Sequence, residues 1–247
     1  MTNLNNNDDI LIETTKSTGS DISSQRLDKL DQKSLFHAVN ISQKENSSAI
    51  DLGSGLGSQG IRFANMGINT TLIDKLDIQN TIKNIKKINP HINQELKFIN
   101  KNIENLNTND LEQNINIVYS QRFINYLTYE KAEDILSLLF NHMSKDGKIY
   151  LSASGINSEL SEGYVDKNKN IKKRYCKLSN KMANKHNIKS PVCLYSQKEL
   201  KTLLEKIGFT VDEIYTSEFG NIKSVSYIIL YGACHFDLNG RNISLEI

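Results

Sequence analysis

The chain has 247 residues, of which 38% are hydrophobic, and its 30 Lys and Arg residues nearly balance its 28 Asp and Glu residues, for a formal net charge of +2. A chain of this length has room for a real hydrophobic core, and so small a charge gives no general reason to expect binding to nucleic acid or to a membrane surface. No apolar run approaches the roughly 18 residues that a membrane-spanning helix needs.

The cysteines indicate the compartment. Cys176, Cys193 and Cys234 are odd in number and show no C-x-x-C spacing. A disulfide framework or a zinc site is therefore not expected, and no other cluster has the spacing of metal ligands. We expect a reducing compartment, the cytoplasm.

The chain order of apolar patterns predicts one domain. Residues 1–21 are rich in Asn, Asp, Ser and Thr and are expected to form a flexible leader, with a single domain over residues 22–247 that begins in a helical cap at about residues 24–39. Strands and helices then alternate, with strands expected at 48–52, 70–74, 96–99, 115–119 and 148–153 and helices at 59–66, 77–88 and 130–143. Such alternation predicts a mainly parallel sheet with helices on both faces.

The end of the chain departs from this alternation. A helix is expected at residues 196–207, with Ser196 as its N-cap and Gly208 as its end. Two extended runs follow, at residues 209–217 and 225–231, joined by a turn near Gly220. Because no helix lies between them, they should be antiparallel neighbours.

The most informative segment lies between the first strand and the next helix. An apolar run ends in Asp51 and Leu52, and three glycines, Gly53, Gly55 and Gly57, alternate before the helix begins. Glycine lets a ligand approach the backbone closely, and the free N–H groups of the helix N-terminus then face that ligand. The segment predicts a nucleotide-type site. Gly55, Gly57 and Gly60 also match G-x-G-x-x-G, the pattern of dinucleotide-binding sites, so a nicotinamide or flavin enzyme is an alternative.

The segment resembles the first motif of class I S-adenosylmethionine-dependent methyltransferases, an acidic residue followed by x-Gly-x-Gly-x-Gly. The glycines begin one step earlier than the dinucleotide pattern requires, and the antiparallel finish of the sheet also resembles this family. The resemblance covers roughly residues 49–233. It implies a Rossmann-like, doubly wound, mainly parallel seven-stranded sheet with an antiparallel last strand and helices on both faces, and S-adenosyl-L-methionine as cofactor.

The resemblance also assigns cofactor-binding residues. Asp74, seventeen positions after Gly57, ends the second strand, where a carboxylate can accept both ribose hydroxyls. Asn102 stands where the family commonly has an Asp that binds the adenine amino group, and Asn can accept the same bond through its carbonyl. The full set of expected cofactor-binding residues is Asp51, Gly53, Ser54, Gly55, Gly57, Asp74, Lys75, Leu76, Asn102, Ile103 and Ser120.

The end of the fourth strand, Tyr119-Ser120-Gln121-Arg122, is where the family places its methyl acceptor. The Asp/Asn-Pro-Pro-aromatic signature of enzymes that methylate nucleobase amines is absent, which argues against that reaction. Arg122 suits an anionic acceptor, and Tyr119 and Tyr126 are further candidates for binding it. No residue stands out as a general base, and methyl transfer needs one only if the acceptor starts protonated.

About forty residues, 155–194, separate the fifth strand from the next helix, and a segment this long is usually functional or disordered. Ile171, Tyr175, Leu178 and Met182 recur at helical spacing and predict a lid helix over the strand ends. Tyr164 and Tyr175 are its candidate substrate contacts. Its basic residues are Lys167, Lys169, Lys172, Lys173, Arg174, Lys177, Lys181, Lys185 and Lys189. They could attract an anionic acceptor, follow a nucleic-acid backbone, or form a solvated face.

The favoured function is a methyltransferase that acts on a small-molecule acceptor, with an anion as one option, by in-line transfer. Nucleic acid is a less favoured acceptor, and no membrane partner is expected. Two alternatives remain open: an NAD(P)-dependent oxidoreductase, and a non-catalytic binding protein on the same fold.

Overall fold

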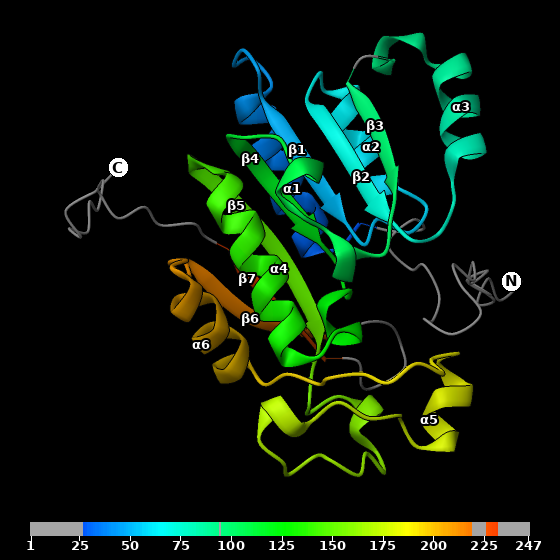
Figure 1. The fold of residues 1–247 in the computed structure, drawn as a ribbon, viewed down its shortest axis with the longest axis vertical. Coiled ribbons are helices and arrows are strands. Elements are labelled where there is room, and N and C mark those ends of the chain that lie inside the picture. Colours follow the sequence, from blue (N-terminus) through cyan, green and yellow to red (C-terminus); the bar gives the residue numbers. More distant parts are fainter. Residues whose placement is uncertain (1–26, 94, 219–225, 232–247) are drawn as a thin grey trace, which may run out of the picture.

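A computed structural model describes residues 27–93, 95–218 and 226–231, so the predicted leader, the turn near Gly220 and Cys234 lie outside the described residues. The strands form one sheet in the order β3-β2-β1-β4-β5-β7-β6 (Figure 1). They are β1 (Ser48–Leu52), β2 (Asn69–Asp74), β3 (Leu96–Asn100), β4 (Ile115–Ser120), β5 (Met143–Ser154), β6 (Glu213–Glu218) and β7 (Ser226–Tyr231).

Helices cover both faces of the sheet. The α-helices are α1 (Lys29–Ile41), α2 (Ser58–Asn65), α3 (Gln79–Ile88), α4 (Tyr129–His142), α5 (Asn180–Lys185) and α6 (Gln197–Ile207). The 3-10 turns are η1 (Pro90–Ile92), η2 (Ile103–Asn105), η3 (Thr108–Asp110), η4 (Ile124–Tyr126), η5 (Glu159–Ser161) and η6 (Ile171–Lys173). Helices α4 and α6 lie in front of the sheet in Figure 1, with α1 and α2 behind it. In the part of the chain that the structure describes, no helix is long and apolar enough to cross a membrane.

The predicted class, an α/β fold with a parallel sheet and flanking helices, is confirmed. Strands β3, β2, β1, β4 and β5 are parallel neighbours, which places their carboxyl ends at one edge of the sheet. Strand β7 pairs antiparallel with both β5 and β6. A ligand site in such a sheet lies outside the carboxyl ends of the strands, where the strand order reverses between β1 and β4.

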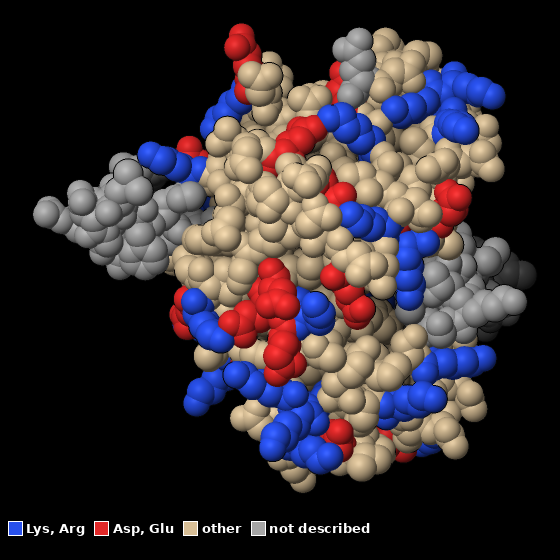
Figure 2. Space-filling model, viewed as in Figure 1, with Lys and Arg blue, Asp and Glu red and all other residues tan. Residues whose placement is uncertain are grey.

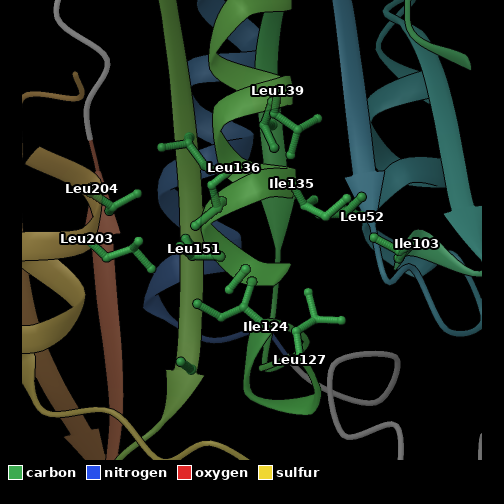
Figure 3. Close-up of a cluster of buried hydrophobic side chains, with 14 of the residues drawn as sticks. Leu52, Ile103, Ile124, Leu127, Ile135, Leu136, Leu139, Leu151, Leu203 and Leu204 are labelled. Atoms are coloured by element: carbon green, nitrogen blue, oxygen red, sulfur yellow. The ribbon is translucent and has the colours of Figure 1, made fainter. Parts of the chain in front are cut away.

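Apolar side chains hold the layers together. The largest cluster fills the space between the sheet and helices α4 and α6, and Figure 3 shows Leu136 and Leu139 of α4 near Leu151 of β5, with Leu203 and Leu204 of α6 beside them. Separate clusters pack α1 and α2 against the opposite face. Burial of these side chains, each worth about 1.5–3 kcal/mol, fixes the sheet on which the site is built.

The residues that flank α6 explain where this helix begins and ends. Ser196 and Glu199 form a reciprocal capping box at the N-terminus, which satisfies backbone N–H groups that have no partner within the helix. Gly208 follows the last residue with φ +120°, and a Cβ there would lie 2.9 Å from Cζ of Phe140. Both the backbone conformation and the close packing against α4 therefore favour glycine.

The lid helix predicted from Ile171, Tyr175, Leu178 and Met182 is wrong. Residues 155–194 form only the turns η5 and η6 and the short helix α5, and Cys176 pairs with Val192 as an isolated antiparallel bridge. The segment lies beyond the carboxyl ends of the strands, at the bottom of Figure 1. It has its own small apolar core, whose members include Leu160, Leu178 and Leu194.

Polar anchors explain why tertiary contacts override the helical spacing in this insertion. The buried Arg174 donates to the carbonyl oxygens of Lys169 and Leu194, and its Nη1 lies 2.9 Å from Oε2 of Glu199 on α6. A helix through Arg174 would remove these bonds and leave a buried guanidinium without partners, which is costly. The insertion is therefore a docked part of the domain.

Candidate active site

The glycine segment after β1 has the backbone that the sequence predicts. Gly53, Gly55 and Gly57 all have positive φ, at +69°, +54° and +80°. A Cβ at Gly53 would lie 2.4 Å from Cγ of Phe123, and one at Gly57 would lie 2.7 Å from Cδ1 of Leu72. The backbone conformation therefore favours glycine at all three positions, and at Gly53 and Gly57 there is also no room for a Cβ.

Asp51 fastens the strand to the helix that follows. Its carboxylate is buried, and Oδ2 accepts a hydrogen bond of 2.9 Å from the N–H of Gly60 in the first turn of α2. Negative charge near a helix N-terminus is favourable. Asp51 therefore ties the end of β1 to the first turn of α2, which holds the glycine loop between them in place.

Asp74 lies at the end of β2, beside the glycine loop. Its Oδ2 accepts from the N–H of Gly55 and its Oδ1 from the N–H of Leu76, both at 2.8 Å. Burial raises the pKa of this carboxyl, and backbone hydrogen bonds from Leu76, Gly55 and Lys75 oppose that rise. A carboxylate has about four acceptor positions, so at least one remains for a ligand's hydroxyl group.

The expected adenine neighbours lie after β2 and β3. Lys75 is exposed and Leu76 half-buried, while Ile103 is buried against the main core. Asn102 is exposed and caps η2, because its Oδ1 accepts from the N–H of Glu104 at 3.2 Å. The structure brings these residues to the same edge of the sheet as Asp74.

Two candidates at the end of β4 have hydroxyl groups that are already engaged. Ser120 is buried and donates to the carbonyl oxygen of Leu52 at 3.0 Å. Tyr119 is buried against Phe63, and its phenol donates to Oδ1 of Asp31 on α1. Burial and the negative charge of Asp31 raise the pKa of Tyr119 well above its usual range. Both side chains hold elements together at the edge of the site.

Arg122 has an unusual backbone. Its φ is +52°, in the left-handed region that side chains with a Cβ rarely adopt. Its N–H lies 3.1 Å from the carbonyl oxygen and 2.9 Å from Oγ of Ser152 on β5, and these contacts hold it there. Residues held in such conformations cluster at functional sites.

The tyrosines of the insertion differ in their positions. Tyr175 is half-buried and donates to the carbonyl oxygen of Tyr126 at 3.0 Å, so it joins the insertion to the turn η4 after β4. Tyr164 is buried inside the insertion, with its hydroxyl 2.7 Å from the carbonyl oxygen of Arg174 and 2.6 Å from that of Val192. Tyr126 and Tyr175 therefore adjoin the strand ends, whereas Tyr164 packs within the insertion.

Sequence reasoning missed a polar cluster between α1 and the end of β4. Gln121 Nε2 donates to Oδ2 of Asp28, the N-cap of α1, and Gln59 Nε2 of α2 lies 3.2 Å from the carbonyl oxygen of Asp31. Burial and the charge of Asp28 raise the pKa of Asp31 to about 7. The only sequence signal was the pair Asp28 and Asp31 at capping-box spacing; their partners come from distant segments.

Three of the nine basic residues of the insertion form ion pairs with acidic side chains within it. Lys169 lies 2.7 Å from Asp166, Lys181 lies 2.6 Å from Glu162, and Lys185 pairs with Glu159. Figure 2 shows Lys and Arg side chains on the lower part of this face, over the insertion, with acidic side chains interspersed. These pairs offset part of the positive charge that a nucleic-acid backbone would require.

The residues present fit an adenosyl cofactor. Two buried polar atoms at the strand ends have no hydrogen-bond partner among the described residues, Oγ of Ser54 in the glycine loop and Oε1 of Gln121. Buried polar groups are normally paired, so such atoms indicate a ligand or water. Together with the remaining acceptor capacity of Asp74, they outline a site with polar groups for both ends of the cofactor.

The sequence profile of a family described as "Methyltransferase domain" matches residues 43–208, about two thirds of the chain, including both the glycine loop and Arg122. The chain belongs to the methyltransferase domain family. It is an enzyme that uses S-adenosylmethionine. No match is found among curated proteins.

Solved methyltransferases share the fold. One from Methanosarcina mazei is 16% identical, with a TM-score of 0.60 over 81% of this chain and 97% of that chain. The 1,6-didemethyltoxoflavin N1-methyltransferase of Burkholderia thailandensis, with its substrate and S-adenosylhomocysteine bound, is 13% identical, with a TM-score of 0.57 over 83% and 82%. The magnesium protoporphyrin IX methyltransferase of Synechocystis PCC 6803 is 13% identical, with a TM-score of 0.55 over 83% and 84%.

The chemistry of this methyltransferase follows from its cofactor and the site. S-adenosylmethionine supplies an activated methyl group, so binding and alignment of the two reactants provide most of the acceleration. In this chain the glycine loop and Asp74 are the residues that would hold the adenosyl part, and the insertion lies beyond the same edge of the sheet.

Proposed function

We propose that this methyltransferase acts on a small, anionic acceptor by in-line methyl transfer, with Arg122 pairing with the negative group of the acceptor. The observation that supports this most directly is the backbone of Arg122, which follows the carboxyl end of β4. Its φ of +52° is left-handed and is held by a hydrogen bond from its N–H to Ser152 on β5. A strained cation at this position suits a carboxylate or phosphate, which a guanidinium binds through two parallel hydrogen bonds.

A small molecule is favoured over a nucleic acid for two reasons. The insertion is docked over the strand ends through Arg174 and Tyr175, which encloses the acceptor side of the site. The pairing of its lysines with Asp and Glu side chains also reduces the positive charge that a phosphate backbone would require. Two of the similar structures named above are methyltransferases of 1,6-didemethyltoxoflavin and of magnesium protoporphyrin IX, both small molecules.

We assign the binding residues as part of the same proposal. Asp74 holds the ribose, with the other expected cofactor contacts grouped around the glycine loop and after β3. Tyr126 and Tyr175, which adjoin the strand ends, border the acceptor beside Arg122. Tyr119 and Tyr164, whose hydroxyls are engaged elsewhere, act by packing. The free thiols of Cys176 and Cys193 suit a reducing cytoplasm.

The test pairs an acceptor screen with a variant of Arg122. Formation of S-adenosylhomocysteine is measured with a set of small carboxylic acids and phosphates and with their neutral esters. We expect turnover of an acid and not of its ester. Arg122→Gln should lower kcat/KM for that acid about 10- to 100-fold, the value of one charged hydrogen-bonded pair, with unchanged affinity for S-adenosylhomocysteine.

A matched control separates this pairing from general attraction. Lys173 is exposed on the insertion, and Lys173→Gln removes the same charge outside the proposed site. It should leave kcat/KM within about twofold. Equal turnover of acid and ester, or equal losses in the two variants, would contradict the assignment of Arg122.

A further inference from the structure

The side-chain amide of Gln121 has a defined orientation. Its Nε2 lies 2.5 Å from Oδ2 of Asp28. A carboxylate can only accept hydrogen bonds, so the NH2 group of Gln121 must face Asp28 and its carbonyl oxygen must face away. That oxygen, Oε1, is buried and has no hydrogen-bond partner among the described residues.

Asp28 is itself held in place by the first turn of α1. Its Oδ1 accepts from the N–H of Asp31 at 3.0 Å, and its own N–H donates to Oδ2 of Asp31 at 2.7 Å. This reciprocal capping box leaves Asp28 little freedom, because both its backbone and its carboxylate are engaged. The orientation of the Gln121 amide is therefore set by a helix that begins more than 90 residues earlier.

The position of Gln121 decides which part of the cofactor it can reach. Asp74 and Asn102 follow β2 and β3, on one side of the glycine loop, whereas Gln121 follows β4, on the other side. This inference rests on the proposed position of the ribose at Asp74, from which a cofactor that crosses the glycine loop would reach β4 with its amino-acid end. Gln121 therefore lies at the end of the site opposite the adenosine.

The surroundings of Gln121 favour a positive charge. Asp28, Asp31 and Asp51 all lie close enough to the phenol of Tyr119 to act on it electrostatically. An ammonium group has three N–H donors and no acceptor, so it needs acceptor oxygens and is stabilised by nearby carboxylates. The buried carbonyl oxygen of Gln121, whose amide group is bonded to the carboxylate of Asp28, matches this requirement.

We propose that Oε1 of Gln121 accepts a hydrogen bond from the α-ammonium group of the cofactor, and that Asp28 is the positioning residue that turns this oxygen toward it. Gln121 is then a cofactor-binding residue, although it lies in the strand-end segment where the acceptor is also bound. The N-terminal helix thereby takes part in cofactor recognition without touching the cofactor.

The experiment measures the affinity of two probes by calorimetry. S-adenosylhomocysteine has the α-ammonium group, and 5′-methylthioadenosine has the same nucleoside and thioether without it. Gln121→Met removes the acceptor oxygen at similar volume. We expect it to weaken S-adenosylhomocysteine about 10- to 100-fold, as for one hydrogen bond to a charged group, and to leave 5′-methylthioadenosine within about twofold.

A charge-swap pair tests the role of Asp28. Asp28→Asn retains a good N-cap, because its one oxygen accepts from the N–H of Asp31. Its NH2 group then faces Gln121 and cannot accept a hydrogen bond, so the Gln121 amide turns and presents N–H groups to the ammonium. The affinity for S-adenosylhomocysteine should fall by a similar factor. In Asp28→Asn/Gln121→Glu the new amide donates to the new carboxylate, whose other oxygen again faces the site, and the affinity should return.

Three results would overturn the proposal. Equal losses for the two probes would place Gln121 against the nucleoside or make it only structural. Unchanged affinity in Gln121→Met, with an unchanged melting temperature, would show that Oε1 does not contact the cofactor. Failure of the double variant to restore the selective binding, while it remains folded, would remove Asp28 as the positioning residue.

Discussion

Gly53→Ala is expected to lower the affinity for S-adenosylhomocysteine by about 100-fold or more, the largest effect among the substitutions considered, because it combines backbone strain with displacement of a neighbouring turn. The new Cβ would lie 2.4 Å from Cγ and 2.7 Å from Cβ of Phe123. These atoms are next to the backbone and cannot move as the tip of a side chain can. Phe123 must therefore shift, and the turn between β4 and η4 shifts with it. Isothermal titration calorimetry measures the loss.

Gly67→Ala is the matched control for this prediction. Gly67 has a similar φ of +79°, but a Cβ there would meet nothing within 4 Å. Both variants bear the strain of a left-handed alanine, about 1 kcal/mol, and only Gly53→Ala adds the contact with Phe123. Cofactor affinity in Gly67→Ala should stay near the wild-type value. Similar affinities in the two variants would show that the loop tolerates displacement of Phe123.

Asp74→Ala is expected to weaken S-adenosylhomocysteine about 10- to 100-fold, the equivalent of 1.5–3 kcal/mol for hydrogen bonds to a charged group. The carboxylate supports the loop through the N–H of Gly55 and is the proposed acceptor for the ribose hydroxyls. Asp77→Ala is the control, because Asp77 is exposed and also accepts from a backbone N–H, that of Gln79. Equal affinities in the two variants would refute the ribose assignment.

Asp74 should also make cofactor binding depend on pH. Burial raises its pKa in the folded protein, so the carboxylate takes up a proton at a higher pH than an exposed aspartate does. The ribose hydroxyls need the ionised form as acceptor. Affinity should therefore be full above the raised pKa and fall as the pH decreases through it, and Asp74→Asn should remove this dependence. A flat profile in the wild-type protein would contradict it.

The fold was predictable because its signals are local. Three alternating glycines predict the turn after β1, and all three have positive φ. Helix α6 begins at Ser196, which caps backbone N–H groups of its first turn, and ends at Gly208. The alternation of apolar runs with helical patterns then determines a parallel sheet with little freedom of topology.

The insertion and the polar cluster at α1 were not predictable, because their structure depends on distant partners. Helical spacing from Ile171 to Met182 is outweighed by the bonds of Arg174 to two carbonyl oxygens and to Glu199. Likewise, the partners of Asp28 and Asp31 lie some 90 residues later, on β4. Periodicity and capping motifs describe neighbours in sequence and contain no information on such contacts.

The most direct test of the central claim, that the glycine loop binds an adenosyl sulfur cofactor, is calorimetric titration of the purified protein with S-adenosylmethionine, S-adenosylhomocysteine, NAD and NADP. We predict saturable binding of the first two compounds and none of the dinucleotides. Each bound ligand should also raise the melting temperature, since it binds only the folded state. Binding of NAD or NADP without binding of S-adenosylmethionine would contradict the account of the site.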